Sequence, residues 1–191
     1  MKKLMTQFFA DAGAASGTLK TLDANIRPLS FEAGAFLIRQ GECAPNLYFI
    51  TEGLVKMFYI TPDGKEFVKS FICEGQISGS LTSLIEGRES TFSIVCLEQV
   101  KAEVVPYDVF QNVVEADPEM LRFGYNFFQT LALKKELREH SFLCLTPQER
   151  YQQFMQDNAH LSRRVTQADI ARYLGITPVA LSRIRGRGKV A

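Results

Sequence analysis

The sequence has few of the residues from which metal centres are built. It contains four cysteines and two histidines, and the cysteines lie 30, 23 and 48 positions apart with no CxxC pair. Zinc and iron–sulfur sites need closely spaced thiolate or imidazole ligands, so neither kind of site has local support. We therefore expect no metal site, and we interpret the cysteines as small buried thiols, with a redox-sensing thiol as the alternative.

The sequence also lacks the features of membrane proteins and of common enzymes. Its longest apolar run is too short to cross a bilayer, and polar residues (Thr6, Gln7 and Asp11) interrupt the apolar core that a signal peptide would need. The patterns GxxxxGK[ST] and GxGxxG are absent, and no nucleophile–base motif occurs. We expect a cytoplasmic protein that is not an enzyme and has no membrane partner.

The charges are unevenly distributed along the chain. Residues 163–189 contain seven basic side chains and one acidic one, which leaves 15 basic and 20 acidic side chains in residues 1–162. The C-terminal segment is therefore near +6 and the remainder near −5. A basic end on an acidic body favours a polyanion as the partner of that end.

Residues 27–106 have the pattern of a β-rich domain. Short runs of β-branched and aromatic residues alternate with glycine-containing turns at spacings of roughly eight to twelve residues, which is typical of a sandwich or barrel. The TPDG sequence at 61–64 predicts a hairpin turn, because Pro62 fixes φ and Gly64 permits positive φ. Residues 1–26 are predicted to form short helices around an AGAASG segment. The predicted strands are FLIR, LYFI, LVKMFYI, EFVKSFI, FSIVCL and KAEVV.

After Pro106 the apolar residues recur at helical spacing. Short helices are predicted over 107–115 and 147–157, and a long helix begins at the capping sequence Asp117-Pro118-Glu119 and runs to about His140. The long helix has two adjacent apolar stripes, whereas one stripe is enough to pack a helix on its own domain. The second stripe favours a symmetric copy as partner, with burial in the monomer's own core as the alternative. The predicted dimer-helix residues are Met120, Phe123, Phe127, Phe128 and Leu131.

Residues 166–185, TQADIARYLGITPVALSRIR, predict a helix-turn-helix. Thr166 is suited to cap the first helix, and Gly175 permits the left-handed backbone of a tight turn. Thr177 and Pro178 then provide an N-cap and a first-turn proline for the second helix. The apolar positions that pack the two helices together are Ile170, Leu174, Leu181 and Ile184.

The outward face of the second helix has the chemistry of a DNA-reading surface. Its first turn offers small and polar groups that can approach base edges, and Arg183 can reach guanine or phosphate. Arg185, Arg187 and Lys189 are better suited to phosphate contacts, which would make the affinity sensitive to salt. The predicted DNA-binding residues are Thr166, Gln167, Thr177, Pro178, Val179, Ser182, Arg183, Arg185 and Arg187.

Taken together, these features resemble the Crp/Fnr family of bacterial regulators over roughly residues 25–185. The glycines at 34 and 41 and the sequence LYFITEGLVK resemble the start of that family's cyclic-nucleotide-binding β-roll. EGQISGS at 74–80 and GREST at 87–91 resemble its ligand cradle, 117–140 its dimer helix and 166–185 its DNA-reading motif. The resemblance implies a homodimer that binds double-stranded DNA at a pseudo-palindromic site, with RNA polymerase as a further partner.

The cradle departs from the pattern of cyclic-AMP-binding members. Those members have a Gly-Glu pair and a later Arg-Ser or Arg-Thr pair, where this chain has Gly79-Ser80 and Ser90-Thr91. Loss of the arginine alone costs roughly ten- to a hundredfold in affinity, and Arg88 is expected to point to the opposite strand face. We expect no tight cyclic AMP binding, and an unidentified small-molecule effector stays open. The residues of this degenerate pocket are Gly75, Ile77, Gly79, Ser80, Leu81, Ser90 and Thr91.

The sequence thus predicts an α+β chain in three parts. Residues 1–116 form a double-stranded β-helix (jelly-roll) sensor domain with N-terminal helices, 117–143 the dimerisation helix, and 144–191 an all-α helix-turn-helix domain. The short joint at 156–165 and the few residues after the second helix predict a reduced form of a winged helix. The predicted function is DNA-binding transcription regulation. The alternative is a ligand-binding module whose helix-turn-helix contacts protein.

Overall fold

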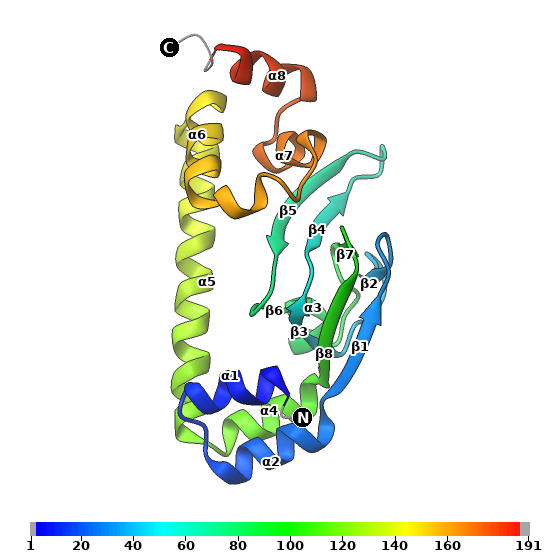
Figure 1. Ribbon diagram of the computed structural model, residues 1–191, viewed down its shortest axis with the longest axis vertical. Helices are drawn as coiled ribbons and strands as arrows, with labels where there is room; N and C mark the ends of the chain where they lie inside the picture. The colour runs from blue at the N-terminus through cyan, green and yellow to red at the C-terminus, as the bar shows by residue number, and fades with distance from the viewer. Residues whose placement is uncertain (1–2, 188–191) are drawn as a thin grey trace.

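The computed structural model describes residues 3–187, and it shows a β-roll, one long helix beside it and a C-terminal helical unit (Figure 1). The roll consists of two antiparallel sheets, with strand orders β1-β8-β3-β6 and β2-β7-β4-β5. All six predicted strands are present, and β1 and β6 were not predicted. The strands are β1 (Arg27–Phe31), β2 (Phe36–Ile38), β3 (Asn46–Glu52), β4 (Val55–Ile60), β5 (Glu66–Ile72), β6 (Ile77–Ser78), β7 (Ser93–Cys96) and β8 (Val100–Pro106).

The alternation of side chains along β4 separates two apolar layers. Successive strand residues point to opposite faces of a sheet, and Val55 and Met57 belong to the core enclosed by the roll. Phe58, together with Leu54 just before the strand, faces the other way and belongs to a second cluster that includes residues of the C-terminal unit. The second sheet is therefore apolar on both faces, and its outer face is covered by helices.

The N-terminal helices close one end of the roll. These are α1 (Leu4–Asp11) and α2 (Ser16–Asn25), which pack with α4 (Tyr107–Glu115) and the first turns of the long helix α5 (Pro118–Cys144) (Figure 1). Glu103 of β8 accepts hydrogen bonds from the backbone N–H groups of Leu4 (2.9 Å) and Met5 (2.6 Å). These donors would otherwise lack partners at the start of α1, so this one carboxylate attaches α1 to the roll.

The long helix begins where the sequence predicts, and it extends to Cys144 rather than ending near His140. Asp117 caps it by accepting from the N–H groups of Glu119 (3.0 Å) and Met120 (3.4 Å), and the same side chain accepts from Ala15 ahead of α2 (2.8 Å). No proline interrupts the helical pattern before Pro147, so the helix continues for one more turn.

The C-terminal unit is helical throughout its described part. It contains α6 (Pro147–Asp157), the 3₁₀ turn η1 (Ala159–Leu161), α7 (Gln167–Leu174) and α8 (Pro178–Arg187). The predicted capping box is present, because Thr146 and Glu149 bond to each other's backbone N–H groups. A short helix, α3 (Leu81–Glu86), was not predicted.

The cysteines only partly fit the expectation of buried thiols. Cys96 is buried in the roll, Cys73 is half-buried, and Cys43 and Cys144 are exposed. Cys43 lies in a loop and Cys144 on the exposed last turn of α5, so neither is enclosed by the core. Within residues 3–187, no group of three or more His, Cys, Asp or Glu side chains is arranged to hold a metal ion. No helix of that range has both the length and the apolar character needed to span a membrane.

Candidate nucleic-acid interface and effector pocket

The helix-turn-helix forms with the local contacts that its sequence predicts. Thr166 Oγ1 accepts from the N–H of Asp169 at 3.1 Å and caps α7. Gly175 ends that helix with φ of 68°, in the left-handed region that favours glycine. Thr177 Oγ1 accepts from the N–H of Ala180 at 3.2 Å and caps α8. Two short helices are thereby fixed on either side of a tight turn.

The predicted DNA-reading face of α8 lies on the surface. Leu181 is 1% exposed and anchors the inner face of α8 against α7, whereas Val179 on the outer face is 61% exposed. The side chains of Arg187 and Lys189 lie outside the described part of the chain. The other predicted DNA-binding residues are all exposed, namely Thr166, Gln167, Thr177, Pro178, Val179, Ser182, Arg183 and Arg185.

Helix α7, the first helix of the helix-turn-helix, packs directly on the outer face of β5. Val68 and Phe71, three positions apart, both belong to the apolar cluster on that face. The β4–β5 pairing shifts register between Met57 and Phe58, and such a bulge lets residues at this odd spacing point the same way. The cluster also contains residues of the C-terminal unit, so the roll and that unit share a core: Phe154, Leu161, Val165, Ile170, Ala171, Leu174 and Leu181.

A buried ion pair lies within this contact. Lys56 Nζ of β4 is 2.9 Å from Asp169 Oδ1 of α7, and the two side chains are 10% and 6% exposed. Burial raises the pKa of Asp169, but the hydrogen bonds from Lys56 and Thr166 outweigh it, so the net pKa lies below its ordinary value. Glu66 of β5 extends the group, 3.5 Å from Lys56 and 3.4 Å from Arg172 of α7.

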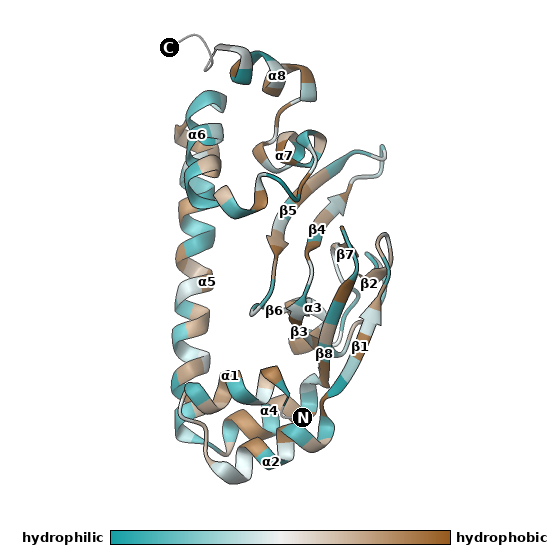
Figure 2. Ribbon diagram, in the orientation of Figure 1, coloured by the Kyte–Doolittle hydropathy of each residue, from teal (hydrophilic) through white to brown (hydrophobic). Residues whose placement is uncertain are grey.

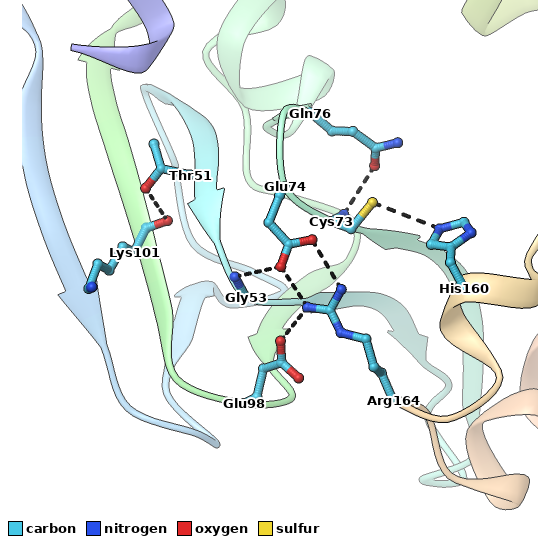
Figure 3. Close-up of polar contacts among 9 residues, drawn as sticks. All are labelled: Thr51, Gly53, Cys73, Glu74, Gln76, Glu98, Lys101, His160 and Arg164. Carbon is cyan, nitrogen blue, oxygen red and sulfur yellow. Dashed lines mark hydrogen bonds and ion pairs between the residues drawn. The ribbon is translucent and has the colours of Figure 1, made fainter. Parts of the chain in front are cut away.

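A second ion-pair group joins the turn after β5 to the segment before α7 (Figure 3). Both Arg164 Nη atoms donate to Glu74, at 3.0 and 2.7 Å, and Nη2 also donates to Glu98. Glu74 further accepts from the N–H of Gly53 at 2.9 Å. The hydrogen bonds from Arg164 lower the pKa of Glu74 to about 2. Beside this group, Cys73 Sγ lies 4.0 Å from His160 Nε2.

The last turns of α5 also contact the helix-turn-helix. Arg138 Nη2 donates to the backbone carbonyls of Val68 (3.0 Å) and Tyr173 (3.1 Å), so one side chain bridges α5, β5 and α7. Phe142 lies so close to Gly175 that a Cβ at that position would be 2.8 Å from its ring. The turn between α7 and α8 thus rests on the last turns of the long helix.

The predicted effector residues do not form one pocket. An open pocket of about 710 Å³ is lined by Ser90 and Thr91, but by none of the other predicted pocket residues. Gly79 packs closely instead, since a Cβ there would lie 2.9 Å from Leu84. Arg88 is exposed and pairs with Glu86. The residues that line the pocket are Gln40, Gly41, Cys43, Gly87, Arg88, Glu89, Ser90 and Thr91.

The segment that corresponds to the cradle is closed by the chain itself. The hydroxyls of Ser78, Ser80 and Ser83 are buried and have no hydrogen-bond partner among the described residues. Ser90 is also buried, and its hydroxyl donates to the carbonyl of Phe92 at 2.7 Å. Phe92 is 2% exposed, with Lys69 Nζ 3.6 Å from the centre of its ring. The position that corresponds to the phosphate-binding arginine is thus a buried serine that bonds to the chain's own backbone.

Comparison with known proteins agrees with this architecture. Residues 28–117 match the model of the cyclic nucleotide-binding domain family. The cAMP-activated global transcriptional regulator CRP of Salmonella typhimurium is 29% identical over 85 residues, which cover 44% of this chain and 40% of that protein. A CRP-like cAMP-activated global transcriptional regulator of Mycobacterium tuberculosis is 26% identical over 120 residues, covering 61% of this chain and 53% of that protein. The matched region is thus about half the length of these relatives or less.

Solved structures extend the likeness over nearly the whole chain. FixK2 from Bradyrhizobium japonicum superposes with a TM-score of 0.75 at 16% identity, covering 85% of this chain and 83% of that one. The c-di-GMP responsive regulator CLP of Xanthomonas campestris gives 0.74 at 18% identity, covering 92% of both chains. A β-roll joined by one long helix to a helix-turn-helix is the architecture of Crp/Fnr regulators. Residues 28–117 therefore match a cyclic nucleotide-binding domain, and the whole chain has the fold of these regulators, which confirms the fold expected from the sequence and supports the expected Crp/Fnr family.

The low pKa of Glu74 predicts how the interface responds to acid. A carboxyl whose folded pKa is about 2, against an ordinary 4.5, stabilises the fold fully above 4.5 and loses that contribution as the pH falls toward 2. Because Glu74 is partly exposed, Glu74→Gln should cost under about 1 kcal/mol at neutral pH, and the difference from wild type should shrink with acidification. Urea unfolding at a series of pH values measures it, with Glu52→Gln, in an exposed pair within the roll, as the control. A difference that stays constant with pH would contradict the assignment.

Proposed function

We propose that this chain is a sequence-specific DNA-binding transcription regulator that acts as a homodimer. The observation that carries the proposal is the geometry of α8, whose inner residue Leu181 is buried while Arg183 and Arg185 are exposed. A helix held on one side by α7 and presenting guanidinium groups on the other suits the major groove of DNA. The relatives named above are transcription regulators, which supports the same function.

The dimer is proposed to form through the middle of α5. Large apolar side chains lie exposed on one face of this helix, namely Leu121 (49%), Tyr125 (65%) and Phe128 (48%). A row of this kind on one helix marks an interaction surface, and Figure 2 shows hydrophobic segments interleaved with hydrophilic ones along α5. A second copy fits best, because a twofold axis beside α5 pairs this row with itself. Two recognition helices could then read half-sites about one DNA turn apart.

This surface differs in part from the predicted one. Phe128 is on it, and Phe127 and Leu131 are half-buried at its edge. Met120 is fully buried against the protomer's own N-terminal helices, and Phe123 packs on the same cluster. The protomer's own helices cover the start of the predicted stripe that begins at Met120, whereas the second stripe, with Leu121, Tyr125 and Phe128, is exposed. The dimer proposal therefore rests on the other stripe.

The proposed effector chemistry excludes tight cyclic AMP binding. The positions of the family's ribose-binding carboxylate and phosphate-binding arginine are both serines, Ser80 and Ser90, and both are buried. A buried phosphate without a cationic partner loses its hydration and receives no compensation. The open pocket beside Ser90 and Thr91 leaves room for another small molecule.

Charge reversal on α8 tests DNA recognition. A random duplex pool first selects the preferred site in a mobility-shift assay, and the affinity for that site is then measured over a salt titration. Arg183→Glu/Arg185→Glu should lose binding by at least about a hundredfold, because each arginine that contacts base or phosphate contributes on the order of 1–3 kcal/mol. Lys20→Glu, a charge reversal on exposed α2, is the control and should bind normally.

Two outcomes of this assay would refute the proposal. One is a wild-type chain that shows neither sequence preference nor a salt slope. The other is unchanged DNA binding by the double variant, which would favour a helix-turn-helix that contacts protein instead.

A charged residue on the exposed stripe tests the dimer. Phe128→Glu should shift the chain from dimer to monomer in sedimentation at micromolar concentration, since it places two carboxylates in the centre of an apolar contact. Leu29→Glu is the control, because Leu29 on β1 is an apolar side chain of similar exposure (45%, against 48% for Phe128), and this variant should remain a dimer. A wild-type monomer, or a Phe128→Glu dimer, would rule out this interface.

Calorimetry tests the effector proposal. Titration of the wild-type chain with cyclic AMP should give a dissociation constant at least about ten- to a hundredfold weaker than that of the positive control, because a lost charged hydrogen bond alone weakens binding by that factor. A regulator that conserves both the glutamate and the arginine serves as the positive control. Micromolar binding by this chain would show that a different set of side chains holds the nucleotide.

A further inference from the structure

Lys56 belongs to the β-roll, yet its ammonium group is directed at the helix-turn-helix unit. It lies on the face of β4 that also carries Phe58, and its side chain is 10% exposed. Its Nζ is 2.9 Å from Asp169 of α7 and 3.5 Å from Glu66 of the neighbouring strand. The roll thus places one buried cation where the C-terminal unit docks.

Stability alone does not account for a lysine at this position. Taking an ammonium and a carboxylate out of water costs about as much as their attraction returns, and apolar residues of similar size are often as stable or more so. The surrounding cluster is apolar, with Phe58, Val68 and Phe71 on the roll. Apolar contacts are non-directional, so they specify the position of α7 less sharply than an ion pair does. A buried ion pair, in contrast, is satisfied in only one arrangement, so Lys56 selects one position of α7 on the sheet.

Asp169 transmits that position to the DNA-reading helix. It lies in the first turn of α7, where its backbone N–H and its carboxylate both bond to the Thr166 hydroxyl, at 3.1 and 2.7 Å. From there α7 leads through Gly175 into α8, and Leu181 of α8 belongs to the same apolar cluster as α7. A displacement of Asp169 therefore displaces α8 as well.

We propose that Lys56 is a positioning residue for DNA recognition, which acts through Asp169 to hold α7 and α8 of its own protomer in the orientation that reads a specific site. This inference rests on the proposed function, and it adds a residue of the sensor domain to the machinery of DNA recognition. A dimer reads two half-sites at once, so an error in the orientation of each α8 weakens specific binding more than contact with random DNA.

The experiment measures the ratio of affinities for the selected site and for a random duplex, using the full chain. Lys56→Met keeps the length of the apolar stem and removes the charge, and it should lower the affinity for the selected site about tenfold while changing the affinity for random DNA little. Lys56→Arg retains a cation that can reach Asp169 and should restore most of the ratio. Sedimentation should show the same dimer for all variants.

Lys65→Met is the matched control. Lys65 lies at the turn of the same β4–β5 hairpin, pairs only with Asp63 among the described residues and is 71% exposed. The Lys65→Met substitution changes the net charge by the same amount as Lys56→Met, so a long-range electrostatic effect on DNA binding would appear in both variants. We expect the Lys65→Met ratio to equal that of the wild type.

A double-mutant cycle shows whether Lys56 acts through Asp169. Asp169→Asn should lower the ratio as Lys56→Met does, and the double variant should be no worse than the more severe single variant, because both remove the same contact. Fully additive effects would overturn the inference, as would an unchanged or increased ratio in Lys56→Met. An equal loss of specific and random binding would overturn it too, since general loosening of the unit explains that result.

The two proposals fail in distinguishable ways. A wild-type chain that binds no duplex overturns the proposed function and this inference together. A wild-type chain that binds its selected site, with a Lys56→Met ratio equal to wild type, overturns the inference alone.

Discussion

The outer face of the second sheet is apolar, and the arrangement of the rest of the chain depends on covering it. Phe58, Val68 and Phe71 lie on a face that, in a free-standing roll, would be open to water. Burial of each such side chain contributes on the order of 2 kcal/mol. The C-terminal unit supplies the cover through Phe154, Ile170 and Leu174. The helices α7 and α8 are therefore attached to the β-roll by a shared core and not by a tether alone.

That shared core is also the feature that the sequence could not reveal. Local signals predicted the helix-turn-helix well, because Thr166, Gly175 and Thr177 act on neighbouring backbone groups and need no distant partner. The contact of Lys56 with Asp169 joins residues 113 positions apart. In the sequence, Lys56 is only a polar residue within an apolar strand. Nothing local distinguishes a lysine that lies in water from one that meets a carboxylate on another unit.

The elements of the roll that the sequence did not predict are those whose local sequence signal is weak. The strand β1 was not predicted because its residues are largely exposed and include Pro28, and such an edge strand lacks a clear apolar alternation. The helix α3 was missed because LTSLIE has only one and a half turns and begins with residues that also favour turns. The cradle residues were identified by position, but the packing of Leu84 on Gly79 and the bond from Ser90 to the Phe92 carbonyl depend on how α3 and the following loop fold, which the sequence did not predict. The effector pocket is consequently the part of the site where sequence position and geometry agree least.

The long helix was predicted to have two apolar partners, and the structure shows where along its length each can act. Its first turns are buried against α1, with Met120 fully enclosed, and its last turns are held by Arg138 and by Phe142 under Gly175. The exposed apolar row lies mainly between these two anchors. In the proposed dimer, a second copy of α5 packs there and joins two protomers whose α8 helices are already held against their own rolls. In such a dimer, a signal that reaches the β4–β5 hairpin can change the separation of the two α8 helices directly through α7. A signal that enters at α5 has to displace α7 and α8 by way of Arg138, which bonds to both β5 and α7. Both routes end on β5 and α7, so under the proposed function an effector would act by changing the relative orientation of these two elements.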